Sequence, residues 1–334
     1  ADNDAGKYYI DYNVSTLSEL TNVKHIGSIE GNNNVGGIIG KNKLNDTTQS
    51  RFYTKTNTMS VTVLISDCQH IGSISGNQNI GGLIGKNEQL SDNTDNVVSL
   101  YNCSSLGDIY SVGDYAGGLI GCANAITTYN ASLNVALSNS YALCNINSNG
   151  NYVGGLFGSI SHGKSSASDC YFSGSIYGKE YVGGLAGQTK SLSIVTSYSN
   201  ASSINGESYV GGIVGFVCGA TSIKSCISAN EKVNAITEAV GRVYGSIESG
   251  ATIGTMNTTE ENKGLATMVV NLNGVQQLLE DGPQHGTNVG RSTLKIKSTY
   301  QGLGWDFTNY WTNQETERDR KSTRLNSSHY SRSR

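Results

Sequence analysis

The strongest constraint on the fold is a six-residue pattern, apolar-Gly-Gly-apolar-apolar-Gly, which recurs along the chain and is called the glycine cassette below. Six close copies are present, and a seventh, Val240-Gly241-Arg242-Val243-Tyr244-Gly245, keeps only part of the pattern. The first glycines lie 45, 36, 37, 29, 28 and 30 residues apart. Repeats of about 20–50 residues are typical of solenoids, propellers and arrays, so the chain is interpreted as stacked copies. The paired glycines, predicted to be structural, are Gly36, Gly37, Gly81, Gly82, Gly117, Gly118, Gly154, Gly155, Gly183, Gly184, Gly211 and Gly212.

A second matched position precedes each cassette, and the distance between the two hardly varies. From this position to the first cassette glycine the spacing is 13, 13, 14, 14, 13, 13 and 15 residues. The rest of each repeat varies, with 28, 18, 19, 12, 11 and 11 residues from the last cassette glycine to the next matched position. One part of the repeat is therefore fixed, and one surface connection absorbs the variation in length. The matched positions are Val23, Cys68, Cys103, Ser140, Cys170, Tyr198 and Cys226.

The repeats favour strands over helices. Glycine accounts for 42 of 334 residues, and no window shows the 3.6-residue periodicity of an amphipathic helix. The sequence predicts an all-β, right-handed parallel β-helix of about seven coils over residues 20–250. Residues 1–19 would form a lead-in, and residues 251–318 a capping or trailing segment, because solenoids need their ends covered. The predicted inward ladder is Ile29, Ile74, Ile109, Ile146, Ile176, Ile204 and Val233.

Two further series are predicted to mark corners of the coil. Glycines two residues after the ladder isoleucines are expected in left-handed turns, at Gly31, Gly76, Gly178 and Gly206. Short polar residues precede the matched positions and are expected to bond neighbouring backbone. This polar series is Asn22, Asp67, Asn102, Asn139, Asp169, Ser197 and Ser225.

The cassette resembles the GLUG motif, Gly-Leu-x-Gly, of secreted and surface repeat proteins of bacteria. The stretch Gly302-Leu303-Gly304-Trp305-Asp306-Phe307, followed by Trp311, is similar to the segment that often closes such arrays. The resemblance implies a right-handed β-solenoid in an extracellular or cell-surface setting, found in adhesins and in accessory regions of large secreted proteins, some of them immunoglobulin A proteases. It implies no activity, because the motif is a building unit and a fold does not define a function.

Composition and charge argue against a membrane span and against nucleic acid as a partner. No apolar stretch of 18 residues occurs, so no membrane span is predicted. Residues 319–329 can be back-translated into a common sequencing-library adapter, so residues 319–334 are interpreted as translated adapter sequence, disordered and foreign to the fold. Without their five basic residues and one acidic residue, 18 basic and 25 acidic residues remain, and the net charge changes from −3 to −7. No basic face remains for nucleic acid.

Neither cysteine nor histidine forms a recognisable chemical motif. Cys68, Cys103, Cys170 and Cys226 share one repeat position with Val and Ser, which indicates a packing slot, although a Cys68–Cys103 disulfide stays open. His25 and His70 share another position, and solvated or corner histidines are favoured over a metal pair because no third ligand recurs. No metal, cofactor or catalytic residue is predicted.

The remaining candidates for function are surface features. Tyr115, Tyr152, Tyr181 and Tyr209 each precede the apolar residue that opens a cassette, so they would stack as a stripe that binds a ligand or only stabilises the coil. The corner insertions 41–60 and 86–97 are a second candidate surface. We expect a non-catalytic surface stalk or adhesin that binds a glycan or a host or matrix protein. An accessory region of a larger secreted hydrolase and a purely structural spacer are the alternatives.

Overall fold

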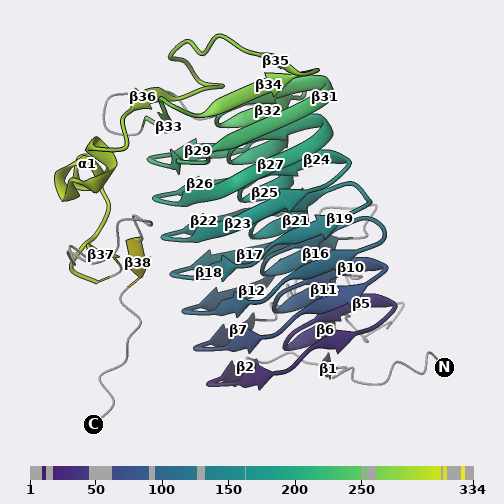
Figure 1. The fold of residues 1–334 in the computed structure, drawn as a ribbon. Coiled ribbons are helices and arrows are strands. Elements are labelled where there is room, and N and C mark those ends of the chain that lie inside the picture. The colour runs from purple at the N-terminus through teal and green to yellow at the C-terminus, as the bar shows by residue number, and fades with distance from the viewer. Residues whose placement is uncertain are drawn as a thin grey trace, which may run out of the picture.

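The computed structural model describes residues 10–12, 18–44, 62–89, 95–125, 132–161, 163–249, 253, 261–309, 311–313 and 325–327. Within them the chain forms a parallel β-solenoid of seven coils, each stacked on the one before (Figure 1). The predicted architecture is therefore confirmed. Each coil passes in turn through a seven-stranded, a 21-stranded and an eight-stranded sheet.

The strands of successive coils follow one another in strict order within each sheet. The seven-stranded sheet holds β2 (Ser18–Thr21), β7 (Thr62–Ser66), β12 (Asp95–Tyr101), β17 (Ser132–Ser138), β22 (Ser165–Ser168), β26 (Leu192–Val195) and β29 (Ser222–Lys224). The eight-stranded sheet holds β1 (Ile10–Tyr12), β6 (Ile39–Leu44), β11 (Ile84–Gln89), β16 (Ile120–Ala125), β21 (Phe157–Ile160), β25 (Ala186–Lys190), β28 (Val214–Cys218) and β32 (Tyr244–Ile247).

The 21-stranded sheet covers the fixed part of every repeat. Its first group is β3 (Lys24–Ile26), β8 (Gln69–Ile71), β13 (Ser104–Leu106), β18 (Tyr141–Leu143), β23 (Tyr171–Tyr177), β27 (Tyr198–Gly211), β30 (Ile227–Ser228), β33 (Lys263–Leu265) and β36 (Thr287–Val289). The second is β4 (Ile29–Glu30), β9 (Ile74–Gly76), β14 (Ile109–Ser111), β19 (Ile146–Ser148), β31 (Lys232–Gly241), β34 (Val269–Leu272) and β35 (Val275–Gln276). The third, leading into the cassettes, is β5 (Asn33–Gly36), β10 (Gln78–Gly81), β15 (Ala116–Gly117), β20 (Val153–Gly154) and β24 (Glu180–Gly183).

Like residues stack on like residues through the solenoid. The first cassette glycines pair in register from Gly36 through Gly81 and Gly117 to Gly241. The predicted isoleucine ladder is confirmed, and from Ile74 onward its members are at most 1% exposed. One core therefore runs the length of the coils.

The cassette is a corner at which backbone packs against backbone. A side chain at Gly82 would overlap the carbonyl oxygen of Gly118 on the next coil and the Ser105 side chain inside the coil. The strand bends after this glycine, and the N–H groups of Leu83 and Ile84 both donate to the Leu119 carbonyl at 2.9 Å. Because of the bend, the successive residues Leu119 and Ile120 are both fully buried. Only glycine allows this close approach.

The seventh cassette shows what happens when the second glycine is lost. Arg242 occupies that position, and its side chain is fully buried. The facing inward residue is Gly264, which leaves room for the guanidinium. The guanidinium donates to Asn288 Oδ1 at 2.5 Å and to the Gly286 carbonyl at 3.2 Å. A large cassette residue is thus matched by a small residue on the facing strand.

The corners differ from their prediction in two ways. Positive φ angles are not found at Gly31, Gly76, Gly178 or Gly206, which are instead tightly packed; at Gly76 a side chain would approach Ile80. The polar series does adopt the left-handed conformation, but its sixth member is Thr196 (φ 44°) rather than Ser197. A β-bulge between Gly174 and Ser175 shifts the register there. Tyr198 therefore pairs with Tyr171, and Ser197 takes the position that Cys170 occupies one coil earlier.

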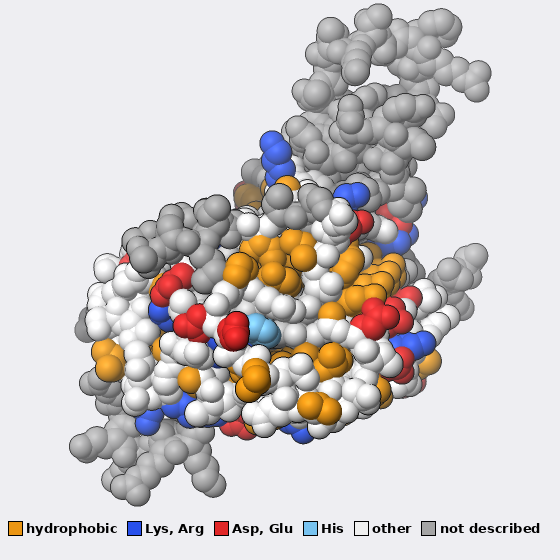
Figure 2. All heavy atoms as spheres, turned by 90° about the horizontal axis from the view of Figure 1, so that it is seen from above, with side chains coloured by type: hydrophobic (Ala, Val, Ile, Leu, Met, Phe, Trp, Pro, Cys, Tyr) orange, Lys and Arg blue, Asp and Glu red, His pale blue; other side chains and the backbone are white. Residues whose placement is uncertain are grey.

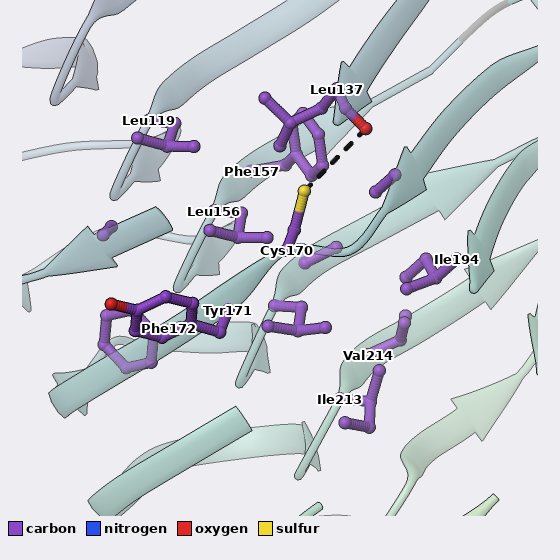
Figure 3. Packing of buried hydrophobic residues seen from close by; sticks show 14 of the residues in the cluster. Leu119, Leu137, Leu156, Phe157, Cys170, Tyr171, Phe172, Ile194, Ile213 and Val214 are labelled. Atoms are coloured by element: carbon purple, nitrogen blue, oxygen red, sulfur yellow. Dashed lines mark hydrogen bonds between the residues drawn. The ribbon is translucent and has the colours of Figure 1, made fainter. Parts of the chain in front are cut away.

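The cysteine slot lies in the core, as the packing interpretation predicted. The thiols at 68, 103, 170 and 226 are at most 1% exposed, and all seven cysteines are buried free thiols. Figure 3 shows the Cys170 side chain among Leu156, Phe157 and Phe172, with Sγ directed at the Leu137 carbonyl at 3.8 Å. Sγ also donates to the Ser168 carbonyl at 3.0 Å. Ser140 and Ser197 make the equivalent bond, whereas the first coil has the apolar Val23 in this slot.

The C-terminal segment extends the solenoid and then folds along its side. β33 and β34 pair with β30 and β31 of the seventh coil, and β34–β35 is an antiparallel hairpin. Residues 291–313, called the brace below, follow with η1 (Thr293–Lys295), α1 (Lys297–Gln301) and β37 (Trp311–Asn313). β37 pairs with β38 (Leu325–Ser327), so this part of 319–334 is a strand; the rest of that predicted disordered stretch lies outside the described residues.

The brace covers an aromatic ladder on the outside of the coils. Trp305 Nε1 donates to the Ser225 carbonyl at 2.8 Å, and Trp311 Nε1 to Asp169 Oδ1 at 3.1 Å. Beneath lie Tyr171 and Tyr198, which are 6% and 5% exposed.

None of the helices in the described ranges is long and apolar enough to span a membrane. Viewed from above, the end of the rod shows scattered hydrophobic and acidic side chains (Figure 2).

Candidate functional site

The four predicted tyrosines form a continuous ladder on the outer corner that precedes the cassettes. Their ring centroids lie 4.8, 5.0 and 5.1 Å apart in chain order, and neighbouring rings are within 11° of parallel. Phe216 of β28 packs against Tyr181 and Tyr209 at 5.2 and 5.3 Å. All four side chains are partly exposed. The ring faces cover one another, so the ladder presents ring edges and a row of hydroxyl groups.

These tyrosines adopt an unusual backbone conformation. Tyr115, Tyr152, Tyr181 and Tyr209 have φ angles of 70°, 62°, 57° and 56°, in the left-handed region. The first two coils carry asparagines there, and Asn79 Nδ2 donates to Asn34 Oδ1 at 3.0 Å. Asparagine tolerates this region, whereas a residue such as tyrosine pays a conformational cost. The sequence predicted the stacking but not this conformation.

The tyrosine hydroxyls are neutral at physiological pH, because the ordinary pKa of a phenol is about 10 and burial raises it further. Burial raises the pKa of Tyr115 to about 12, and it also raises the pKa of Tyr152 and Tyr181. Each phenol therefore remains protonated near neutral pH and both donates and accepts hydrogen bonds. The ladder therefore presents a row of neutral groups that can donate and accept hydrogen bonds.

A second surface feature is a groove on an outer corner of the first four coils. Its volume is about 440 Å³. It is lined by Glu30, Gly31, Ser75, Gly76, Asn77, Tyr110, Ser111, Val112, Asn147 and Asn149. Tyr110 is 47% exposed and Val112 67% exposed, so the groove presents an aromatic ring and an aliphatic side chain to solvent.

The groove arises from one extra residue in the corner of the third and fourth coils. Seven residues separate Ile74 from Gly81, but eight separate Ile109 from Gly117. Ser111 Oγ lies 3.1 Å from the Asn77 carbonyl and 2.9 Å from that of Gly113, which holds the longer corner in place. The longer corner forms a step beside the shorter one, and the groove lies at this step. The 14-residue spacing was visible in the sequence, but its consequence was not predicted.

The histidine pair differs from its prediction. The rings of His25 and His70 stack with centroids 5.1 Å apart, as the repeat predicted, but His70 is fully buried rather than solvated. Its position faces inward, in register with Ser105. His70 Nε2 lies 2.9 Å from the Gly72 carbonyl, which can only accept, so His70 Nδ1 accepts from His25 Nδ1 at 3.0 Å. Burial lowers the pKa of His70.

Acidic residues are spread along the rod. Asp67 and Asp169 belong to the same corner series with Asn102 and Asn139 between them, and Asp169 accepts from Thr196 Oγ1 at 2.8 Å and from Trp311. In the part of the chain that the structure describes, no three His, Cys, Asp or Glu residues form a metal-binding group. Of the two corner insertions, residues 45–60 and 90–94 lie outside the described residues, whereas 41–44, 86–89 and 95–97 belong to the strands β6, β11 and β12.

Comparison with known proteins gives one distant structural likeness. No protein-family model and no curated protein sequence matches the chain. Among solved structures, the crystal structure of "a putative immunoglobulin A1 protease from Bacteroides ovatus" is similar over 84% of this chain and 72% of that one. The TM-score is 0.43 and the sequence identity 16%. So distant a likeness carries no argument about this chain.

Proposed function

We propose that the chain is a non-catalytic extracellular repeat module, a stalk or adhesin that holds a host or matrix ligand on its outer surface. The observation that carries the proposal is the tyrosine ladder. Four coils place tyrosine at a left-handed position that asparagine fills in the first two coils. Backbone strain retained at an exposed position is a feature of functional sites.

The composition supports the extracellular setting. Only 15% of residues are charged, and serine, asparagine, threonine and glycine are abundant. The resemblance to GLUG repeats of bacterial surface proteins points to the same setting. The row of protonated phenols suits an extended polar partner, such as a glycan or the backbone of a matrix protein.

The test is binding of the full chain to epithelial cells, mucin and extracellular-matrix proteins. We expect binding to at least one of them, and we expect the double variant Tyr152→Asn, Tyr181→Asn to bind more weakly while it remains folded. Asparagine preserves the left-handed backbone and removes the ring and hydroxyl. A wild-type chain that binds none of these surfaces would refute the proposed function. Unchanged binding by the double variant would make the ladder purely structural.

A further inference from the structure

We propose that the groove around Tyr110 is a binding site for uncharged saccharides. This inference rests on the proposed function, because it assigns a ligand class to a binding module. The groove is separate from the tyrosine ladder. It lies where coils of unequal corner length meet, and its lining comes from four successive coils.

The lining combines the two kinds of group that a sugar ring engages. A pyranose has an apolar C–H face, which packs on an aromatic ring, and a rim of hydroxyls, which pair with amides. Tyr110 supplies an exposed ring, and among the described residues its hydroxyl bonds to Asp108 Oδ2 at 3.4 Å. The aliphatic Val112 beside it extends the apolar surface.

The amides in the groove are unengaged. Asn77, Asn147 and Asn149 are exposed, and none of their side chains bonds to any residue in the described ranges. Farther along the ladder that contains Asn147, asparagines are engaged with one another: Asn234 Nδ2 donates to Asn205 Oδ1 at 2.6 Å. Unpaired amides beside an exposed ring are therefore particular to the groove, and each offers both donors and an acceptor.

Charge selects among saccharides. Glu30 is the charged residue that lines the groove, and no lysine or arginine lines it. A sulfated or sialylated glycan would meet a carboxylate without a balancing cation, so neutral hexoses and N-acetylhexosamines fit best. Tyr177, 54% exposed, lies two coils from Tyr110 in the same ladder, with Asn147 between them. The two rings are separated by about 10 Å, twice the interstrand spacing, which suits an oligosaccharide rather than a monosaccharide.

The experiment is an array of neutral oligosaccharides with sialylated and sulfated counterparts of equal length, followed by calorimetric titration of the best ligand. We expect the full chain to bind neutral glycans. Tyr110→Ala should weaken binding about tenfold or more, whereas Tyr110→Phe keeps the ring and stays within about threefold. Asn147→Ala should weaken binding severalfold. Tyr101→Ala is the matched control, because Tyr101 is equally exposed, at 44%, on β12 of another sheet.

Three outcomes would overturn the inference: no neutral glycan is bound, only charged glycans are bound, or Tyr110→Ala binds as the wild type does. Circular dichroism and thermal unfolding establish that each variant is folded. Attachment to cells or matrix is measured in parallel on the same variants. If attachment persists while the glycan results fail, the groove inference falls and the proposed function stands; if the wild type attaches to nothing, the proposed function falls too.

Discussion

At the scale of single residues, the stacking of the tyrosine rings opposes the energetic cost of their left-handed backbone. A left-handed backbone costs about 1–2 kcal/mol for an ordinary residue. A stacked aromatic pair contributes about 0.5–1.5 kcal/mol beyond its buried area. Tyr181 has a stacked partner on each side and Phe216 at its edge. Its stacking is therefore sufficient to offset the backbone cost, which explains how tyrosine is tolerated there.

This balance predicts different effects for two substitutions at one position. Tyr181→Ala removes the stacking and keeps the backbone cost, so we expect the free energy of unfolding to fall by about 1–3 kcal/mol. Tyr181→Asn also removes the stacking but suits the left-handed conformation, so it should lose about 1 kcal/mol less than alanine. Urea unfolding of both variants checks the difference. Equal losses would show that the backbone conformation contributes nothing.

The cassette predicts that a single methyl group is not tolerated at its second glycine. At Gly155 the added carbon would overlap the Gly184 carbonyl on the next coil and the Phe172 ring. Because backbone cannot move aside without breaking the ladder, we expect Gly155→Ala to cost about 3 kcal/mol or more. Gly282→Ala is the control, since nothing lies within 4 Å of its added carbon. A Gly155→Ala melting temperature within a degree or two of the control would contradict this account of the corner.

Some residue positions were predictable from sequence and others were not, for a physical reason. The isoleucine ladder was predicted because an identical apolar residue recurs at a fixed spacing. The left-handed tyrosines were missed because intrinsic preference argues against them, and packing with neighbouring coils prevails. The prediction placed the sixth polar residue at Ser197 instead of Thr196. The cause is a β-bulge, which adds a residue that periodicity alone does not reveal.

At the scale of elements, the position of the brace matches a change from polar to aromatic residues along one outer ladder. In the first three coils that ladder is polar, with Lys24, Gln69 and Ser104, and Gln69 Nε2 donates to Ser104 Oγ at 2.9 Å. The ladder then becomes Tyr141, Tyr171 and Tyr198. The brace covers the aromatic part, with Trp311 6.3 Å from Tyr171. The resemblance to GLUG arrays implied that the segment from Trp305 to Trp311 closes the array; in the structure the two indoles pack on the side of the rod, against Ser225 and Asp169.

We expect Trp311→Ala to detach the brace without unfolding the coils. The substitution removes a nearly fully buried indole, its bond to Asp169 and its contact with Trp305, for a local cost of about 3–5 kcal/mol. Hydrogen exchange should accelerate in α1 and around Trp305, while β13 and β14 keep their protection. Faster exchange in all coils would show instead that the brace is needed for the whole core.

The buried thiol of Cys226 predicts a loss of stability in alkali. Burial raises the pKa of Cys226 to about 12, whereas a thiol in the unfolded chain ionises near pH 8.5. Below pH 8.5 both states hold the proton; between about pH 8.5 and 12 only the unfolded state releases it, so stability falls as pH rises. The expected loss is about 1.4 kcal/mol per pH unit for each such thiol.

Urea unfolding under reducing conditions at pH 7.5, 8.5 and 9.5 measures this slope. Cys226→Ala lacks the thiol, so its free energy of unfolding should decline less steeply with pH, by about the 1.4 kcal/mol per pH unit that one titrating thiol contributes. Identical slopes for the variant and the wild type would mean that Cys226 ionises freely in the folded state.

At the scale of the whole molecule, the number of coils and their order were predictable, because they follow from counting cassettes. The groove was not, because it depends on a difference of one residue between adjacent corners rather than on any single motif. The length of a corner has meaning only beside the corner on which it stacks. In this chain the residues that all copies share determine the architecture, and the differences between copies determine the surface features.

The two ends of the rod should open with different ease. In a solenoid each coil is stabilised by its neighbours, so a terminal coil with one neighbour is weaker than an internal coil. The seventh coil is covered by β33 and β34, and Val233 and Val270 of this region are fully buried. In the first coil Ile26 is 68% exposed and Ile29 is only partly buried.

Hydrogen exchange followed by mass spectrometry should therefore show β3 and β4 exchanging faster than β30 and β31, with the slowest amides in the third to sixth coils. Local opening of the first coil should occur without loss of the core, since sub-global units open below the global free energy. Capping offers the control: removal of residues 263–313 should bring exchange of β30 and β31 close to that of β3 and β4. If the first coil of the intact chain is protected as strongly as the fourth, stacking does not limit its stability, and the nearest-neighbour account of this rod is wrong.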